Sequence, residues 1–301
     1  MDDNGIFIDS AFFVWKKTDK GYYWDESQET KQEFGDIALV QSPKSTSFLQ
    51  YYPLDDYPVL FIEFAEIEPT KENILQFVNK YGLLTKDFYK NTDKVLVEAN
   101  SLRFCRSEIR IIQEAFNLFT LLKTSNLEEL SKIIRWNLDK SNAVTKIRYT
   151  YTLEDSVGKY GNNCDITPET NPQIFSRFIV DDFILPARAI LQSIINKQLK
   201  KHSVNLRLLL DNSNKLQPYL YPTTLLAAMW YQLYQAVATN KKFKRCAYCN
   251  KWNDITNKAH NWKACPGCAG RARAKKHYYK KKILAKNIYM RSSNIICFHA
   301  K

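Results

Sequence analysis

Four of the seven cysteines stand in two C-x-x-C pairs in the last quarter of the chain. Cys246 and Cys249 form the first pair, and Cys265 and Cys268 form the second after fifteen intervening residues. Each C-x-x-C turn presents two sulfur atoms, so two turns can close a tetrahedron of thiolates around one divalent ion. The spacing therefore predicts one structural Zn²⁺ held by these four residues.

A catalytic role is not expected for this ion, because four thiolates leave no coordination position for water or substrate. Two redox dithiols or two disulfides are the alternatives. Disulfides are disfavoured by the predicted cytoplasmic location, since residues 1–4 lack the basic and apolar stretches of a targeting signal. His260, between the pairs, could replace one sulfur, although an exposed loop histidine is the preferred interpretation. Cys105 is expected in a helical core, and Cys164 and Cys297 have no identified partner.

A strongly basic segment follows directly after the second cysteine pair. Residues 270–284 are rich in Ala, Arg, Lys and Leu, which favour a helix, and Arg271, Lys275 and Lys282 recur on one face with Tyr278. No acidic residue lies near enough to relieve the repulsion between these cations, whereas the phosphates of a nucleic acid would. The candidate nucleic-acid contacts are seven basic residues of this segment: Arg271, Arg273, Lys275, Lys276, Lys280, Lys281 and Lys282.

The charge of the chain is divided unevenly along its length. The 301 residues carry a formal net charge of +13, of which residues 1–240 carry −3 and residues 241–301 carry +16, with Asp254 as the only acid in the latter. Such asymmetry favours a nucleic acid as partner, DNA rather than RNA. A solvated basic face, a nuclear-import signal and an anionic membrane surface are the alternatives for the same cations.

Residues 245–282 resemble the CGNR-type zinc finger of bacterial proteins described as stress-induced transcription regulators. The resemblance is carried by Cys268-Ala269-Gly270-Arg271-Ala272, the basic residues that follow, and Tyr278. Ala269 and Gly270 stand where that family has Gly-Asn, and the second cysteine pair is more tightly spaced. The resemblance implies zinc binding by a regulatory protein and a DNA-binding role for Arg271 and its neighbours.

The residues before the cysteines are expected to form a mixed α+β body that is mostly helical. Apolar residues at steps of three and four predict helices over 70–81, 102–122, 125–138, 171–202 with a kink at Pro186, and 223–239. Alternating or β-branched runs predict strands over 58–64, 147–151 and 204–210. The aromatic-rich residues 1–56 fit short strands and loops.

Three parts are therefore expected. Residues 1–240 form the body, 241–286 a treble-clef-like or zinc-ribbon module with a basic helix, and 287–301 a short apolar tail. The uncharged helix over 223–239 is short for a bilayer core of about 30 Å, so no membrane association is predicted. No sequence feature sets the oligomeric state.

The body carries no clear sign of an enzyme. Asp181 and Asp182 are adjacent in a predicted helix, so their side chains point about 100° apart and do not form a two-metal carboxylate site. None of the eight glycines belongs to a phosphate-binding loop motif. The predicted function is zinc-dependent nucleic-acid binding by a regulatory protein. A nuclease-, toxin- or defence-effector-like body with a nucleic-acid-binding zinc tail, and a zinc-ribbon protein adaptor, are the alternatives.

Overall fold

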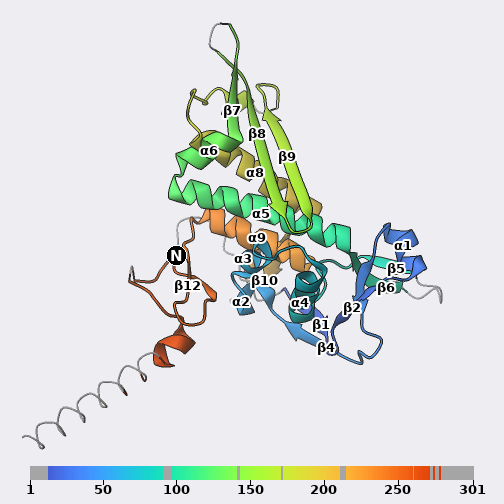
Figure 1. Ribbon diagram of the computed structural model, residues 1–301. Helices are drawn as coiled ribbons and strands as arrows, with labels where there is room; N and C mark the ends of the chain where they lie inside the picture. The colour runs from blue at the N-terminus through green and yellow to red at the C-terminus, as the bar shows by residue number, and fades with distance from the viewer. Residues whose placement is uncertain are drawn as a thin grey trace, which may run out of the picture. The chain divides into compact units, whose positions relative to one another are not determined.

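The computed structural model of the chain describes residues 13–90, 96–140, 143–170, 172–210, 215–259, 261–271, 274 and 278. It divides the chain into two units, Met1–Asn240 and Lys241–Lys301. Helices contain 42% of the residues and strands 27%, and the strands form several small sheets (Figure 1). The expected mixture of helix and strand is therefore confirmed, with helix the larger part.

Four helices form the core of the first unit. They are α3 (Leu60–Ala65), α5 (Leu102–Thr124), α8 (Ile184–Lys201) and α9 (Leu225–Ala238). α9 packs against each of the other three, and its residues 225–233 are all buried. A helix that is apolar on every side needs neighbours on every side, which explains its central position. Within the described part of the chain, no helix combines the length and the apolarity that a bilayer span requires.

One buried polar side chain on α9 fixes the chain that precedes α3. Gln232 Oε1 accepts a hydrogen bond from the backbone N–H of Phe61 (3.2 Å), and its Nε2 donates to the carbonyl oxygens of Pro53 (3.2 Å) and Tyr57 (2.8 Å). Helix α2 (Pro53–Asp56) lies at this contact. Because each polar atom of the amide has a partner, the glutamine holds these segments together without an unsatisfied group.

Short antiparallel strands make up the N-terminal part of the first unit, as its aromatic-rich sequence indicated. β1 (Trp15–Thr18) pairs with β4 (Phe48–Tyr51). A four-stranded sheet has the order β2 (Tyr22–Asp25), β3 (Ala38–Gln41), β6 (Leu96–Ser101) and β5 (Phe88–Lys90). Helix α1 (Gln28–Phe34) connects β2 to β3.

Helix α4 (Lys71–Tyr81) confirms the helix expected over 70–81. The Thr70 side chain caps it by accepting from the backbone N–H of Asn73, and the helix stops at Gly82. Gly82 has a φ of 92°, and a Cβ there would lie 2.8 Å from the carbonyl oxygen of Lys16. Only glycine fits this close approach of the chain to β1.

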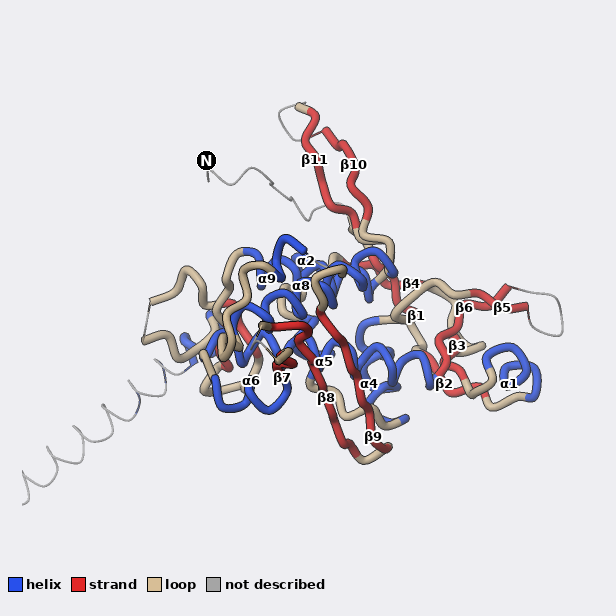
Figure 2. The backbone as a smooth tube through the Cα atoms, turned by 90° about the horizontal axis from the view of Figure 1, so that it is seen from above, coloured by secondary structure: helices blue, strands red, loops and turns tan. Residues whose placement is uncertain are grey.

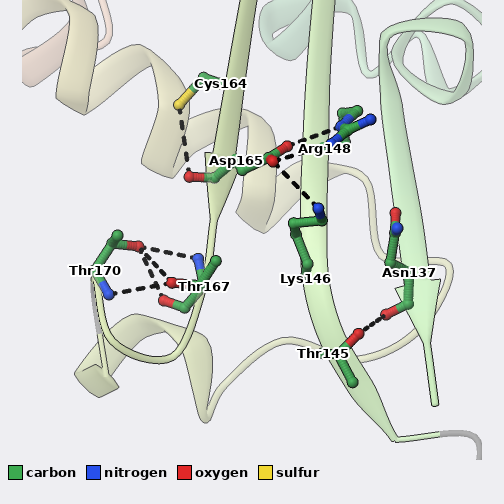
Figure 3. A network of polar contacts seen from close by, with 8 residues as sticks. All are labelled: Asn137, Thr145, Lys146, Arg148, Cys164, Asp165, Thr167 and Thr170. Atoms are coloured by element: carbon green, nitrogen blue, oxygen red, sulfur yellow. Dashed lines mark hydrogen bonds and ion pairs between the residues drawn. The ribbon is translucent and has the colours of Figure 1, made fainter.

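A three-stranded antiparallel sheet stands against α5 and α8. Its order is β7 (Ile134–Leu138), β8 (Val144–Asp155) and β9 (Gly158–Ile166). Asp165 on β9 lies opposite Arg148 on β8, accepts from its Nε at 2.9 Å, and lies 3.3 Å from the Lys146 ammonium (Figure 3). Arg148 and then Lys146 lower the pKa of Asp165 to about 2. The preceding residue, Cys164, points to another side of the strand, as the pleat requires.

A two-stranded hairpin, β10 (Asn205–Leu210) and β11 (Leu216–Tyr221), extends away from the helices of the first unit (Figure 2). It confirms the strand expected over 204–210. In the second unit, β12 (Phe243–Arg245) pairs with β13 (Trp252–Asp254).

The strand expected over 58–64 is wrong. The structure places α3 there, with Leu60, Phe61, Ile62 and Phe64 all buried. A short continuous apolar run fits a buried strand and a buried helix equally well, because its periodicity does not distinguish them. Packing against both α5 and α9 selects the helix.

Two helices are shorter in the structure than the sequence predicts. Helix α6 (Leu127–Ile133) ends where Ile134 begins to pair with Tyr149, so the expected helix over 125–138 becomes a helix and the strand β7. The helix expected over 171–202 is divided into α7 (Pro172–Phe175) and α8. Pro186 lies in the first turn of α8, where no backbone donor is needed, so it does not kink a longer helix.

Asp181 and Asp182 lie in the turn before α8 and not inside a helix. Asp181 has a φ of 69°, which an aspartate tolerates better than most residues. Asp182 Oδ1 accepts from the backbone N–H groups of Ile184 (2.9 Å) and Leu185 (3.3 Å). Asp182 therefore caps the start of α8, and the expectation that the two aspartates lie inside a helix is wrong.

Candidate metal centre

The four paired cysteines come together in the second unit. The Sγ atoms of Cys246, Cys249, Cys265 and Cys268 all lie within 4.8 Å of one another, and those of Cys249 and Cys265 are 3.8 Å apart. A tetrahedron with metal–sulfur bonds of 2.3 Å has edges of about 3.8 Å. The cluster can therefore hold one metal ion, and the sequence spacing identified all four residues.

The first cysteine pair is positioned by the hairpin β12–β13. The N–H of Cys246 donates to the carbonyl of Lys251, and the N–H of Asn250 donates back to the carbonyl of Cys246, both at 2.9 Å. Asn250 has a φ of 56°, a left-handed conformation that asparagine adopts more readily than most residues. This tight turn directs both sulfur atoms of the pair to the same side.

The second pair opens a helix that is described over residues 266–271 and at residues 274 and 278. The N–H groups of Cys268 and Ala269 donate to the carbonyl of Cys265 at 3.0 and 2.9 Å. The helix thus begins before Gly270, where the sequence placed its start. A bond from Ala247 N–H to the Lys263 carbonyl (2.9 Å) ties the two cysteine turns together.

The sulfur atoms differ in their protonation. Burial opposes ionisation of Cys246, but the backbone N–H groups of Cys265, Tyr248 and Cys249 face its sulfur and lower its pKa to about 6. Cys265 N lies 3.4 Å from that sulfur. Contacts with the neighbouring sulfur atoms of Cys265 and Cys249 raise the pKa of Cys268 to about 12. A thiolate is thus favoured at Cys246 and disfavoured at Cys268, so a metal ion that binds the Cys268 sulfur must displace its proton.

The charges around the cluster are almost all positive. Asp254 is the only acid in residues 241–301, and its carboxylate lies 3.2 Å from the Lys241 ammonium and accepts from the Thr256 hydroxyl. Arg245 is also engaged, because its guanidinium lies 4.7 Å over the Trp252 ring and donates to the Asn250 carbonyl. The exposed cations of the described residues in this unit are Lys242, Lys244, Lys251, Lys258, Lys263 and Arg271.

Of the seven predicted nucleic-acid contacts, the structure describes one. Arg271 is exposed on the helix over 266–271, and its Nε donates to the Gly267 carbonyl at 3.4 Å. The other six lie outside the described residues, as does His260: they are Arg273, Lys275, Lys276, Lys280, Lys281 and Lys282. The tail over 287–301 also lies outside.

One feature of the second unit was not singled out from the sequence. Tyr248, inside the first cysteine pair, is 62% exposed. Its position was the available signal, because a four-residue turn is too small to bury an aromatic ring. Lys242 and Lys244, in the basic stretch before this pair, are exposed as well.

Comparisons with known protein families, curated protein sequences and solved structures gave no match. The resemblance to the CGNR-type zinc finger stays a prediction.

Proposed function

We propose that the protein binds nucleic acid in a zinc-dependent manner, with one structural Zn²⁺ on Cys246, Cys249, Cys265 and Cys268. The observation that carries the proposal is the charge of the second unit. The described residues of this unit include six exposed cations, while its single acid is engaged by Lys241 and Thr256. A surface of this kind attracts a polyanion.

The choice of zinc rests on the donor set. Four thiolates in a tetrahedral cluster favour Zn²⁺ over hard cations such as Mg²⁺ and Ca²⁺, which prefer oxygen ligands. The neighbouring Arg245 and the exposed lysines offset the negative charge that four thiolates place on a divalent ion. In such a module the ion supplies folding free energy and performs no chemistry, because its coordination is complete.

The choice of DNA rests on which basic side chains follow the second cysteine pair. Arg271 and the lysines beside it suit contacts with the phosphate backbone, and an arginine next to a cysteine turn can make a bidentate contact with a base edge. The regulatory role is the one that the CGNR resemblance implies.

Fluorescence anisotropy with labelled duplex DNA, single-stranded DNA and structured RNA tests this proposal. The zinc-loaded, full-length protein should bind the duplex, and the double variant Lys242→Ala/Lys244→Ala should bind it about tenfold or more weakly. The matched control is Lys159→Ala/Lys200→Ala, which removes two exposed lysines of the first unit. Equal losses in the two double variants, or no binding by the wild type, would refute the proposal.

A further inference from the structure

A cavity of about 250 Å³ lies inside the first unit, far along the chain from the cysteine cluster. Four elements border it: the helices α5 and α8 and the strands β8 and β9. Its walls combine isoleucine side chains with tyrosine rings and several polar groups. The volume is below that of a site for a drug-sized molecule, so an occupant must be small.

A buried carboxylate forms part of the wall. Glu114 on α5 has no exposed surface; its Oε1 accepts from the Asn162 amide at 2.8 Å and its Oε2 from the Tyr160 hydroxyl at 3.2 Å. Both donors are neutral. Among the described residues, no lysine, arginine or histidine lies within ion-pair distance of Glu114. Burial raises the pKa of this carboxyl group.

A second buried glutamate on the same helix shows what Glu114 lacks. Glu108 is equally buried, but it pairs with the Lys201 ammonium at 2.5 Å and the His202 ring at 3.1 Å. Although burial opposes its charge, His202 and Lys201 hold the pKa of Glu108 below its usual range. A buried carboxylate is stable when a cation accompanies it. Glu114 has no ion-pair partner among the described residues, and the charge of Lys197, on the same cavity, acts on it only from beyond ion-pair distance.

The hydroxyl group of Tyr149 lies beside Glu114 at the same cavity. Tyr149 is fully buried, and its hydroxyl has no well-aligned hydrogen bond with the described residues. Burial, and then the nearby Glu114, raise the pKa of this hydroxyl. The Tyr149 oxygen can therefore accept a hydrogen bond from a group that is bound next to Glu114.

We propose that this cavity binds a small organic molecule through a protonated amine, with its ammonium group on Glu114. The ammonium would donate to the Glu114 carboxylate and to the Tyr149 oxygen, and the faces of Tyr149 and Tyr160 favour a cation beside them. The apolar part of the ligand would lie against the isoleucine side chains of α5 and α8.

Lys197 distinguishes two kinds of amine ligand, simple amines and amino acids. It lies at the cavity on α8 and is exposed, whereas Glu114 is inside. A ligand that carries both an ammonium and a carboxylate group, such as an α-amino acid, would place the carboxylate near Lys197. A simple amine would leave Lys197 in solvent. The remaining titratable groups of the cavity are Tyr160 and Cys164, both on β9.

The test uses the zinc-loaded, full-length protein, calorimetric titration and thermal unfolding. The probes are primary alkylamines and α-amino acids, with alcohols and carboxylic acids of the same size as controls. Compounds with an amine should bind and raise the midpoint of unfolding of the first unit, and the controls should do neither. Lys197→Ala should weaken amino acids alone if they are the ligand class, and should leave amines unchanged in either case.

Three variants locate the binding. Glu114→Gln should weaken binding about tenfold or more, because the carboxylate and its charge-assisted hydrogen bond are lost. Glu154→Gln, an exposed acid on β8, is the matched control and should bind as the wild type does. Ser193→Phe changes an exposed residue at the cavity and should block entry without affecting the fold. Failure of every amine to bind, or full binding by both Glu114→Gln and Ser193→Phe, would overturn the proposal. Neither result depends on nucleic-acid binding.

Discussion

At the scale of single residues, the four cysteines are distinguished by what faces their sulfur atoms. Cys246 is buried, and its sulfur accepts from the backbone N–H of Cys265 in the opposite cysteine pair, so it links the two halves of the cluster. Cys164, in contrast, lies on β9 of the first unit, 4.0 Å from the Asp165 carbonyl. The two residues therefore offer a ligand variant and a matched cysteine control.

Cys246→Ser should abolish stoichiometric zinc binding, because a neutral hydroxyl replaces a thiolate ligand. Native mass spectrometry should find one zinc ion per chain in the wild type and in Cys164→Ser, and none in Cys246→Ser after brief exposure to a chelator. A Cys246→Ser protein that keeps its full zinc content would remove this residue from the ligand set.

Glu114 should make the stability of the first unit depend on pH. Its pKa is raised from 4.5 in the folded state, so its contribution to stability is complete below pH 4.5 and is lost as the pH rises through the folded-state pKa. Glu114→Gln, which cannot ionise, should therefore gain stability relative to the wild type as the pH rises from 4.5 to 7. Urea unfolding across this range measures the difference, and parallel pH profiles would contradict it.

The pair of Arg110 and Asp155 should have the opposite pH dependence. Arg110 donates twice to Asp155 at 2.8 Å, the pair is largely buried, and Arg110 lowers the pKa of that carboxyl group from 3.8. Arg110→Ala should cost about 1–3 kcal/mol in the free energy of unfolding at pH 7. The deficit should shrink as the pH falls from 3.8 through the lowered pKa, because Asp155 then becomes protonated in both proteins.

Arg148→Ala is the control for this pair. Arg148 also donates twice to an aspartate, Asp165, but its side chain is 48% exposed, so solvent screens the interaction. Arg148→Ala should lower the free energy of unfolding by clearly less than Arg110→Ala does, as measured by urea titration. Equal costs would show that burial does not decide the strength of these pairs.

At the scale of elements, the hairpin β12–β13 has only three residues in each strand, too few to be stable alone. A module of this size needs a metal ion to fold. Chelation should therefore make the backbone amides of residues 243–254 exchange rapidly with solvent, while the amides of α5 and α9 stay protected. Hydrogen-exchange mass spectrometry distinguishes the two. Protected amides in the hairpin after chelation, or loss of protection throughout the chain, would contradict this.

Elements with a regular apolar period could be predicted from the sequence. The helices α4, α5 and α9 and the strand β8 follow such periods, and short-range packing does not override them. The helix α3 and the strand β7 could not be predicted. The apolar run of α3 has no informative period, and β7 is selected by its pairing with Tyr149 and Ile147 of β8.

The two candidate sites also differ in whether the sequence could predict them. The metal centre was predictable because C-x-x-C spacing is local, and two local turns suffice to bring four sulfur atoms together. The cavity at Glu114 was not, because its partners Tyr160 and Asn162 lie 46 and 48 residues away in the sequence. Packing of β9 against α5 brings them together, and no spacing rule anticipates it.

At the scale of the whole molecule, the two units differ in charge and in the kind of site that they carry. The first unit carries slightly more acids than bases and encloses a cavity, and the second carries a net charge of +16 around its cysteine cluster. Zinc binding, small-molecule binding and nucleic-acid binding can thus be tested separately. If all three hold, the protein joins a ligand-binding unit to a nucleic-acid-binding unit.

The salt dependence of DNA binding is the decisive measurement for the proposed nucleic-acid binding. The affinity of the zinc-loaded, full-length protein for a duplex is measured at several salt concentrations. If five to seven cations of residues 241–286 contact phosphates, the plot of log affinity against log salt concentration should have a slope of roughly −4.5 to −6. Removal of residues 241–301 should abolish this binding. Salt-independent binding, or an affinity unchanged by the deletion, would contradict the account.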